Sequence, residues 1–186
     1  GKIGNTTSTF QPNAGGGTAP MDGSFFRDVD ETLPTIRAGA GVGFGDTGDN
    51  TARMRAAAGT NRFDRLWRGG FGFGTGDIPD ADTVDSATFS LVVFSKATGL
   101  DSTNVEITSF APTDGANLVI ADYALTLYGS TLFATGRDIA GITTSTTVYT
   151  DWTFVAAGLT GISKTANTYF GVRLKWEIED RFTGTD

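Results

Sequence analysis

The sequence predicts an all-β protein, a jelly-roll-type antiparallel β-sandwich with an extended N-terminal arm. Three observations favour this class. Short segments of alternating apolar and polar residues recur along the chain, Gly-rich turns separate them, and hardly any stretch has the apolar period of an amphipathic helix. The 186 residues suit one domain of moderate size or one domain plus an arm, and a hydrophobic content of 39% is enough for a real core.

The arm is predicted from composition. Residues 1–20 are mostly Gly, Thr, Ser, Asn and Pro, and Ile3 and Phe10 are their only sizeable apolar anchors. Such a segment is typical of a flexible arm, so we place the sandwich domain at residues 21–186. Within that domain, residues 21–58 contain short apolar pieces interrupted by Gly and Asp. This pattern favours short strands and turns over helices.

Five later segments alternate between apolar and polar side chains and are therefore predicted to be strands. They are residues 61–74, 83–96, 104–110, 145–155 and 168–179. In the second of them, Val92 and Val93 make both faces apolar, as expected of a central strand in a sandwich.

Two segments between these strands are less regular. Residues 116–125 fit a short helical turn or loop as well as a strand. Residues 156–165 have Gly158 and Gly161 within a run of small side chains, which predicts at most a single helical turn.

The chain has no His and no Cys. It therefore lacks the usual general base near neutral pH, the commonest metal ligand and the thiolate nucleophile. Carboxylate chemistry on sugars would still require two Asp or Glu side chains brought together by the fold. We expect a protein that is not an enzyme and that uses no cofactor, with calcium as the one option discussed below.

The charge balance bears on possible partners. The chain has 14 basic and 21 acidic residues and a formal net charge of −7, so phosphate backbones and anionic membrane surfaces would repel it. No apolar run approaches the length of a membrane span, and the first ten residues lack the pattern of a signal peptide. We expect no nucleic-acid partner and no membrane insertion, and a soluble chain whose targeting peptide, if any, has been removed.

Four segments follow one another in the order DGSFFRDVDETLPTIRAGAG, NRFDRLWRGGFGFGTGDIPDADTVDSATFSLVVFSKATGL, VIADYALTLYGST and YTDWTFVAAGLTGISKTANTYFGVRLKWEIE. This succession resembles a family of β-rich modules found in phage and metagenomic structural proteins. The likeness covers roughly residues 20 to 180 in order and spacing, and a more distant one is to DNRLRE-type jelly rolls of secreted bacterial surface proteins. The resemblance implies a jelly-roll fold and a place on a virion or cell exterior, and it carries no catalytic residues.

The chain departs from this family at two places. The phage modules close with a further strand, whereas this sequence stops at RFTGTD, and GFGFGTGDIP has Gly where the family has bulkier residues. Either the last strand lies beyond residue 186 or the sandwich has an open edge. An open edge can accept a strand from a neighbour, so the arm of residues 1–20 is a candidate for strand exchange between copies.

Acidic residues give a weak indication of calcium binding. Asp28 and Asp30 lie close together in sequence, and Asp46 and Asp49 lie in the run GDTGDN. Carboxylate and carbonyl oxygens are the ligands of Ca²⁺, but the spacing fits no EF-hand loop. Asp and Asn beside Gly are also favoured in ordinary turns, and that alternative stays open.

Aromatic side chains could form a platform that stacks on sugar rings. The candidates are Trp67, Trp152, Trp176, Tyr149 and Tyr169. The strand alternation places most of them in the core instead, where they add buried area and edge-to-face contacts.

Five arginines lie within 16 positions of an acidic chain: Arg53, Arg55, Arg62, Arg65 and Arg68. They could form ion pairs within the sheet, or they could form an electropositive strip that docks on an acidic neighbour. Because few acids lie beside them in sequence, we favour docking. Together with Ile3 and Phe10 they are the predicted interface residues.

From these features we predict a phage virion structural protein. It would act as a capsid decoration, head-fibre or tail-appendage subunit, through contacts with other virion proteins and with copies of itself. One alternative is a carbohydrate-binding or adhesive module of a secreted or cell-surface protein, and another is a subunit of an extracellular filament. The predicted location is the virion, with the secreted or cell-surface location belonging to the alternative.

Overall fold

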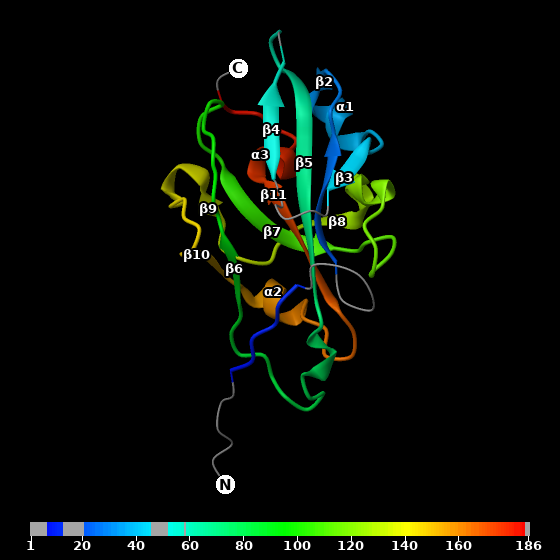
Figure 1. Cartoon of the computed structure of the whole chain (residues 1–186), viewed down its shortest axis with the longest axis vertical. Coiled ribbons are helices and arrows are strands. Elements are labelled where there is room, and N and C mark those ends of the chain that lie inside the picture. The colour runs from blue at the N-terminus through cyan, green and yellow to red at the C-terminus, as the bar shows by residue number, and fades with distance from the viewer. Residues whose placement is uncertain (1–6, 13–20, 46–51, 58, 185–186) are drawn as a thin grey trace.

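The computed structural model describes residues 7–12, 21–45, 52–57 and 59–184. Within these ranges nine strands form one antiparallel sheet and two strands form a second (Figure 1). The strands are β1 (Asp22–Arg27), β2 (Glu31–Thr32), β3 (Gly43–Gly45), β4 (Arg53–Ala56), β5 (Arg62–Phe73), β6 (Thr88–Val92), β7 (Asn104–Phe110), β8 (Tyr128–Leu132), β9 (Arg137–Asp138), β10 (Tyr149–Thr153) and β11 (Thr168–Leu174).

The longest strand, β5, is the centre of the large sheet. Along one edge it pairs with β1 and β2, and along the other it pairs first with β4 and then with β11. The sheet continues from β11 to β7, which pairs with β8 and β9, and at the opposite side β3 is added to β1. All these pairings are antiparallel, so they confirm the predicted class.

The second, small sheet consists of β6 and β10. An isolated bridge between Ala134 and Phe154 connects it to the β8 side of the large sheet. Trp152 of β10 is buried, and its indole N–H donates to the carbonyl of Val105 on β7 at 3.1 Å. The small sheet therefore packs over part of the large one, which gives a two-sheet sandwich. The jelly-roll order of strands stays a prediction.

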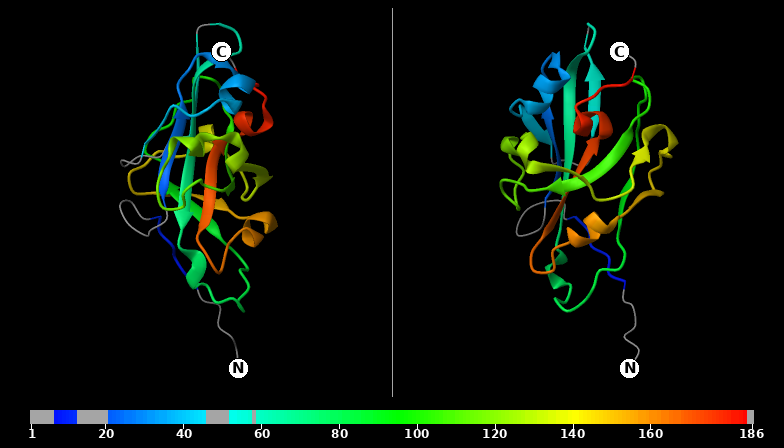
Figure 2. Two further views of the ribbon diagram at one scale, coloured as in Figure 1. Left: turned by 90° about the vertical axis from the view of Figure 1, so that its right-hand side faces the viewer. Right: turned by 180° about the vertical axis from the view of Figure 1, so that it is seen from behind.

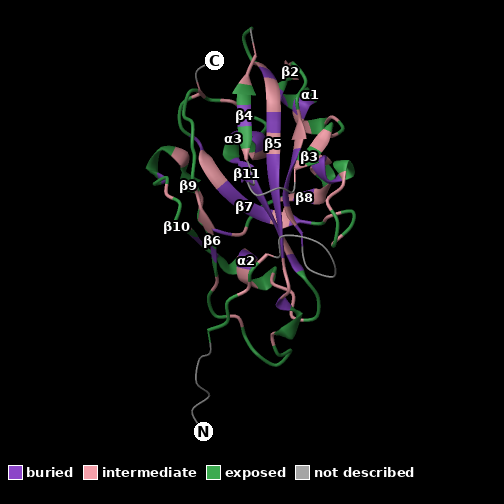
Figure 3. Cartoon of the chain, viewed as in Figure 1, coloured by how far each residue is buried: buried purple, intermediate pink, exposed green. Residues whose placement is uncertain are grey.

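Side-chain alternation gives the large sheet two buried faces. Phe71, Ile107, Phe170 and Val172 lie in the cluster covered by the small sheet. The other face carries a second cluster, with members that include Phe25, Leu66, Phe110, Tyr123 and Tyr128. Figure 3 shows the buried positions concentrated along β5, β7 and β11, as a sheet covered on both faces requires.

Short helical elements cover the second cluster. They are α1 (Leu33–Ala38), α3 (Lys175–Glu179) and the 3₁₀ turns η2 (Ile120–Tyr123) and η3 (Leu125–Leu127), while α2 (Ala156–Thr160), η1 (Thr75–Asp77) and η4 (Ile139–Gly141) lie elsewhere. Figure 2 shows α1 and α3 together toward one end of the molecule and α2 toward the other.

Two expectations about helices were wrong. The strand predicted over residues 168–179 ends at Leu174 and turns into α3, because Trp176 and Glu177 both face inward from a helical turn. Residues 21–58 were expected to lack helices, yet α1 forms there. Pro34 lies in the first turn of α1, where a backbone N–H has no partner within the helix, so the N–H that Pro lacks is not missed. Leu33 and Ile36 are the buried residues of α1.

The other element predictions agree with the structure to different extents. The strand over 104–110 is confirmed residue by residue, and the turn predicted within 156–165 is α2. The strand expected over 83–96 forms only at β6, and 116–125 contains 3₁₀ turns. Of the predicted arm, residues 7–12 have no regular secondary structure and the rest lies outside the described residues.

Candidate functional site

The small sheet presents an exposed apolar surface at one end. Tyr149 is 61% exposed, Val148 is 59% exposed and Phe94 is 52% exposed, and Val92 pairs directly with Tyr149. Cross-strand partners point to the same face, so Val92 and Tyr149 share the outer face of the small sheet, and Phe94 follows two residues after the end of β6. We call these three residues the outer apolar end.

The strand β6 has an open side. It pairs with β10 along one edge, and no backbone hydrogen bond joins its other edge to any part of the chain that the structure describes. Thr88 and Ser90 are exposed on this strand, whereas Phe89 is buried beneath the sheet. An unpaired strand edge is a row of free N–H and C=O groups that can accept another strand.

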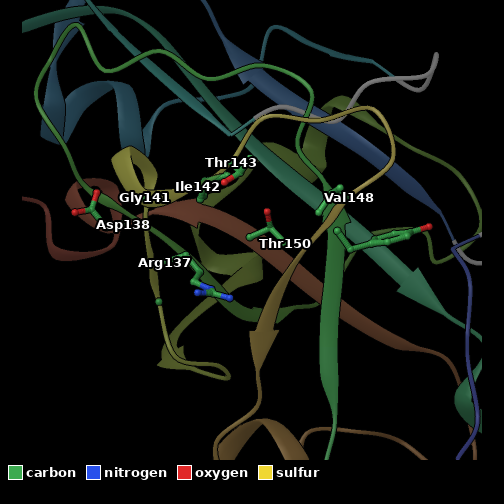
Figure 4. Close-up of a pocket in the computed structure, with 9 residues that line it drawn as sticks. Arg137, Asp138, Gly141, Ile142, Thr143, Val148 and Thr150 are labelled. Atoms are coloured by element: carbon green, nitrogen blue, oxygen red, sulfur yellow. The ribbon is translucent and has the colours of Figure 1, made fainter.

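An open pocket of about 460 Å³ lies beside β10. Its lining residues are Gly136, Arg137, Asp138, Gly141, Ile142, Thr143, Val148, Tyr149 and Thr150. Figure 4 shows Val148 and Thr150 on the β10 side of this space and Ile142 and Thr143 across from them. The pocket therefore combines apolar walls with hydroxyl groups and one guanidinium.

Two charged residues of the pocket are held by local contacts. The Nε of Arg137 donates to the backbone carbonyl of Asp151 on β10 at 2.7 Å. This side chain therefore takes a backbone acceptor that a further strand beside β10 would otherwise use. Asp138 caps η4 by accepting from the N–H of Ala140 at 2.9 Å, and it also accepts from Ser102. The Ser102 hydroxyl and the Ala140 N–H hold the pKa of Asp138 below its usual range.

Four of the five predicted interface arginines are ion-paired within the molecule. Arg55 pairs with Asp64 at 2.7 Å, Arg62 with Asp30 at 2.8 Å, Arg65 with Asp28 at 3.1 Å and Arg68 with Glu177 at 2.8 Å. Few acids lie beside these arginines in sequence, but Asp28 and Asp30 reach Arg65 and Arg62 from the connection between β1 and β2. The pairs of Arg55, Arg62 and Arg65 lie at least partly in water, where each adds little stability.

Arg68 is 0% exposed, so it does not belong to a surface strip. Arg53, Arg55, Arg62 and Arg65 reach the surface in part and stay predicted interface residues. Phe10 is half-buried in the described arm segment, and Ile3 lies outside the described residues.

Arg68 belongs to a buried ion cluster that sequence reasoning missed. Glu177 of α3 lies between Arg68 of β5 and Arg173 of β11, and all three side chains are at most 2% exposed. Burial acts to raise the pKa of Glu177, but the two arginines outweigh it and hold the pKa below its usual range. The Arg68 guanidinium also lies 4.2 Å from the centre of the Tyr123 ring.

The sequence contained one signal for this cluster, since Glu177 follows Arg173 by four residues. That spacing brings two side chains together on one face of a helical turn, and a strand was expected there. The arginines gave no signal of their own, because Arg68 shares its strand parity with Arg62 and Asp64, and Arg173 has the parity opposite to that of the apolar residues of its segment.

A second buried carboxyl group, Glu106 on β7, faces the same side of the large sheet. It is 2% exposed, and its Oε2 atom has no hydrogen-bond partner among the described residues. Burial raises the pKa of Glu106, a hydrogen bond from Asn104 opposes that effect, and Lys175 of α3 opposes it further.

The calcium candidates are only partly described. Asp28 accepts a hydrogen bond from the Trp67 indole at 2.8 Å in addition to its Arg65 contact, and Asp30 is bound to Arg62. Asp46 and Asp49 lie outside the described residues. Within the part of the chain that is described, no group of three or more acidic residues is placed to hold a metal ion.

The aromatic candidates for a sugar platform are mostly internal. Trp152 is buried on β10, as the alternation predicts, and Trp176 is buried from the helical turn α3. Trp67 is half-buried and stacks on Phe26 with the ring centres 4.5 Å apart, and Tyr169 donates to the carbonyl of Gly115 at 3.0 Å. Tyr149 is the candidate that stays open to solvent, next to the pocket.

Comparison with known proteins adds no family to this description. No protein-family model, no curated protein and no solved structure matches the chain. Among the described residues, no helix is long and apolar enough to cross a membrane. The resemblance to phage modules and to DNRLRE-type domains stays a prediction.

Proposed function

We propose that this protein is a structural subunit of a phage virion, as a capsid decoration, head-fibre or tail-appendage protein. It acts through contacts with other virion proteins and with copies of itself, and not through catalysis. The antiparallel sandwich and the family resemblance of the sequence support the proposal. The virion is accordingly its proposed location.

The observation that carries the proposal is the surface of the small sheet. There the open edge of β6 and the outer apolar end lie on the same two-stranded element. A free edge offers backbone hydrogen bonds, and exposed aromatic and aliphatic side chains offer area to bury, so one surface supplies both requirements of a protein–protein contact.

Repetition would strengthen such a contact. A five-residue strand edge with a few apolar side chains makes a small interface, and a small interface alone is weak. In a symmetric array many copies engage at once, and the combined attachment becomes strong through multivalency. A decoration or fibre subunit of this kind would attach through many weak contacts that act together.

Electron microscopy of phage particles from the source of this sequence tests the proposal. Particles would be labelled with a gold-tagged antibody raised against the whole chain. We expect label at regular positions over capsids, or along fibres or tails. Particles without label, in a preparation whose lysate contains the chain by immunoblot, would overturn the proposal.

A carbohydrate-binding function is the second candidate, and the pocket beside β10 favours it. Hydroxyl groups of Thr143 and Thr150, the Arg137 guanidinium and the exposed Tyr149 ring are the groups that bind sugar hydroxyls and ring faces. Saturable binding on a glycan array that is lost in both Tyr149→Ala and Thr150→Val would support this function, and a decoration subunit predicts no such binding.

A further inference from the structure

The outward groups of the β6 edge follow from its pairing with β10. The N–H of Phe154 donates to the carbonyl of Ala87 at 3.0 Å, so Ala87 directs its backbone groups toward β10. Backbone groups of an antiparallel strand alternate in direction, and Phe89 and Leu91 therefore also bond toward β10. Thr88, Ser90 and Val92 direct their N–H and C=O groups away from β10, along the open edge.

Three of the usual protections against pairing, namely charged residues, Pro and a bulge, are absent from this strand. Residues 86–95, SATFSLVVFS, contain no charged residue and no Pro. The pairing of β6 with β10 is regular, without a bulge that would turn the edge aside. Among the described residues, nothing in the pairing or the sequence of β6 opposes a strand from another chain along this edge.

We infer that the partner of this edge is β6 of a second copy, paired antiparallel about a two-fold axis at Ser90. In that register Ser90 lies opposite Ser90 of the second copy, and Thr88 lies opposite Val92. The three outward residues then form three hydrogen-bonded pairs, each exchanging two backbone bonds. The inference rests on the proposed function, whose self-contact it assigns to a particular strand.

The side chains match in the same register. On the inner face Phe89 meets Leu91 and Ala87 meets Val93 of the second copy, so every cross-strand pair there is apolar. On the outer face Ser90 meets itself and Thr88 meets Val92, so no like charges oppose each other. A strand can pair with its own copy when the residues brought opposite each other are compatible, and the inner apolar pairs and the uncharged outer pairs of β6 meet this condition.

The dimer would turn two small sheets into one four-stranded sheet, in the order β10, β6, β6, β10. Leu91 and Val93 are half-buried in the single chain, and the facing residues of the second copy would cover them further. The pairing thereby extends the core that contains Phe89 and Trp152 across the axis.

Sedimentation equilibrium of the full chain over a wide concentration range is the first test. The single chain has a mass of 19.5 kDa, and we expect a reversible rise to twice that value, 39 kDa. A mass that stays at that of the monomer up to the highest concentration reached would overturn the inference.

A matched pair of double variants tests the register. In Thr88→Lys/Val92→Lys, lysines face each other at both ends of the paired strands, and we expect the dimer Kd to rise by about tenfold or more. In Thr88→Asp/Val92→Lys the same positions form ion pairs across the axis, so the dimer should be at least as tight as the wild type and should weaken with added salt. Equal dimerisation by the two variants would refute this register.

Hydrogen exchange keeps the inference testable even if a variant folds poorly. In the wild type, the amides of Thr88, Ser90 and Val92 should gain protection as the concentration rises, while those of Phe89 and Leu91 stay protected throughout. Protection of the first three amides that does not change with concentration would contradict pairing with a second copy. Deletion of residues 1–20 should leave dimerisation unchanged, and its loss would make the arm the occupant of this edge.

The failure of this inference and of the proposed function can be told apart. Labelled particles together with a monomeric chain would support the virion role and refute the pairing of β6 with a second copy. A dimer in solution together with unlabelled particles would support the pairing and refute the virion role.

Discussion

The charges of Arg68, Glu177 and Arg173 are buried together, and each depends on the others. Glu177 Oε1 accepts from the Arg68 guanidinium at 2.8 Å, and its two oxygens also contact Arg173. The guanidinium groups use their remaining donors on backbone carbonyls, such as Arg68 on Arg37 at 2.9 Å and Arg173 on Gly129 at 3.0 Å. A buried charge with these partners is tolerated, and the same charge without them is costly.

Removal of the shared carboxylate should therefore be severe. Glu177→Gln leaves two buried guanidinium groups without a counter-charge, and we expect the free energy of unfolding to fall by about 3–5 kcal/mol. Urea denaturation followed by circular dichroism measures this loss. The matched control is Glu179→Gln in the same short helix, which removes an exposed pair with Lys175 and should change stability by less than about 0.5 kcal/mol. Equal losses of unfolding free energy in the two variants would mean that the buried carboxylate matters no more to stability than the exposed one.

Glu106 predicts a pH effect with a definite sign. Burial raises its pKa in the folded state, so the folded protein holds this proton over a range of pH where the unfolded chain has lost it. The ionised form destabilises the fold, and that penalty develops as the pH rises from about 4 through the folded-state pKa. Glu106→Gln should gain about 1 kcal/mol at neutral pH and lose this advantage toward pH 4.

Thermal unfolding of both proteins across this pH range measures the effect of Glu106. An advantage of the Gln variant that is constant with pH would show that the carboxyl group is not the cause. Glu177 has the opposite shift, so its contribution is present above its unfolded-state pKa and is lost as the pH falls through the lower folded-state value.

At the scale of elements, glycines in the centre of the sheet leave space for aromatic rings. A Cβ atom at Gly70 of β5 would lie 2.7 Å from a ring carbon of Phe110 and 2.8 Å from one of Phe25. The glycine therefore lets these two rings pack against the strand itself. Gly70, the first glycine of the run GFGFG, is explained by close packing of rings against the backbone of β5.

Gly70→Ala should destabilise the protein by about 1–3 kcal/mol, because both rings must shift to admit the methyl group. Gly45→Ala in β3 is the control, since a Cβ there would meet nothing within 4 Å. Chemical denaturation of the two variants gives the comparison. A Gly70→Ala protein as stable as the control would show that the rings move freely and that the close contact is not a constraint.

Alternation located most strands but could not locate where β11 ends. Phe170, Val172, Leu174 and Trp176 have the parity of one continuous strand. The chain nevertheless turns at Lys175, where helical geometry brings Glu177 back to Arg173 and buries Trp176 against the other cluster. The competing helical period is only one turn long, which is too short to stand out in the sequence.

At the scale of the whole molecule, Trp152 joins the two sheets. Its ring packs near Phe89 within the small sheet, with centres 6.2 Å apart, and its indole reaches the backbone of β7. Trp152→Ala should cost about 3–5 kcal/mol of unfolding free energy. Trp152→Phe keeps most of the buried ring but not the hydrogen bond, and it should cost clearly less.

Calorimetric unfolding of the two Trp152 variants measures this difference. Hydrogen exchange of the Trp152→Ala protein should show early loss of protection in β6 and β10, with β5 and β7 protected for longer. Simultaneous loss in all four strands would mean that the small sheet does not open separately from the large one.

The sequence by itself determined the antiparallel β class, the extent of β7, the turn at α2 and the burial of Trp152. These features follow from local alternation and from Gly placement, which depend on a few neighbouring residues. Only the tertiary structure decided that Arg68 is internal, that Glu177 lies between two arginines, that Trp176 is buried from a helical turn, and that one edge of β6 is unpaired among the described residues. Those features depend on which distant segments lie side by side, and the free energy of burying a charge or leaving an edge unpaired is set by those neighbours and not by the local sequence.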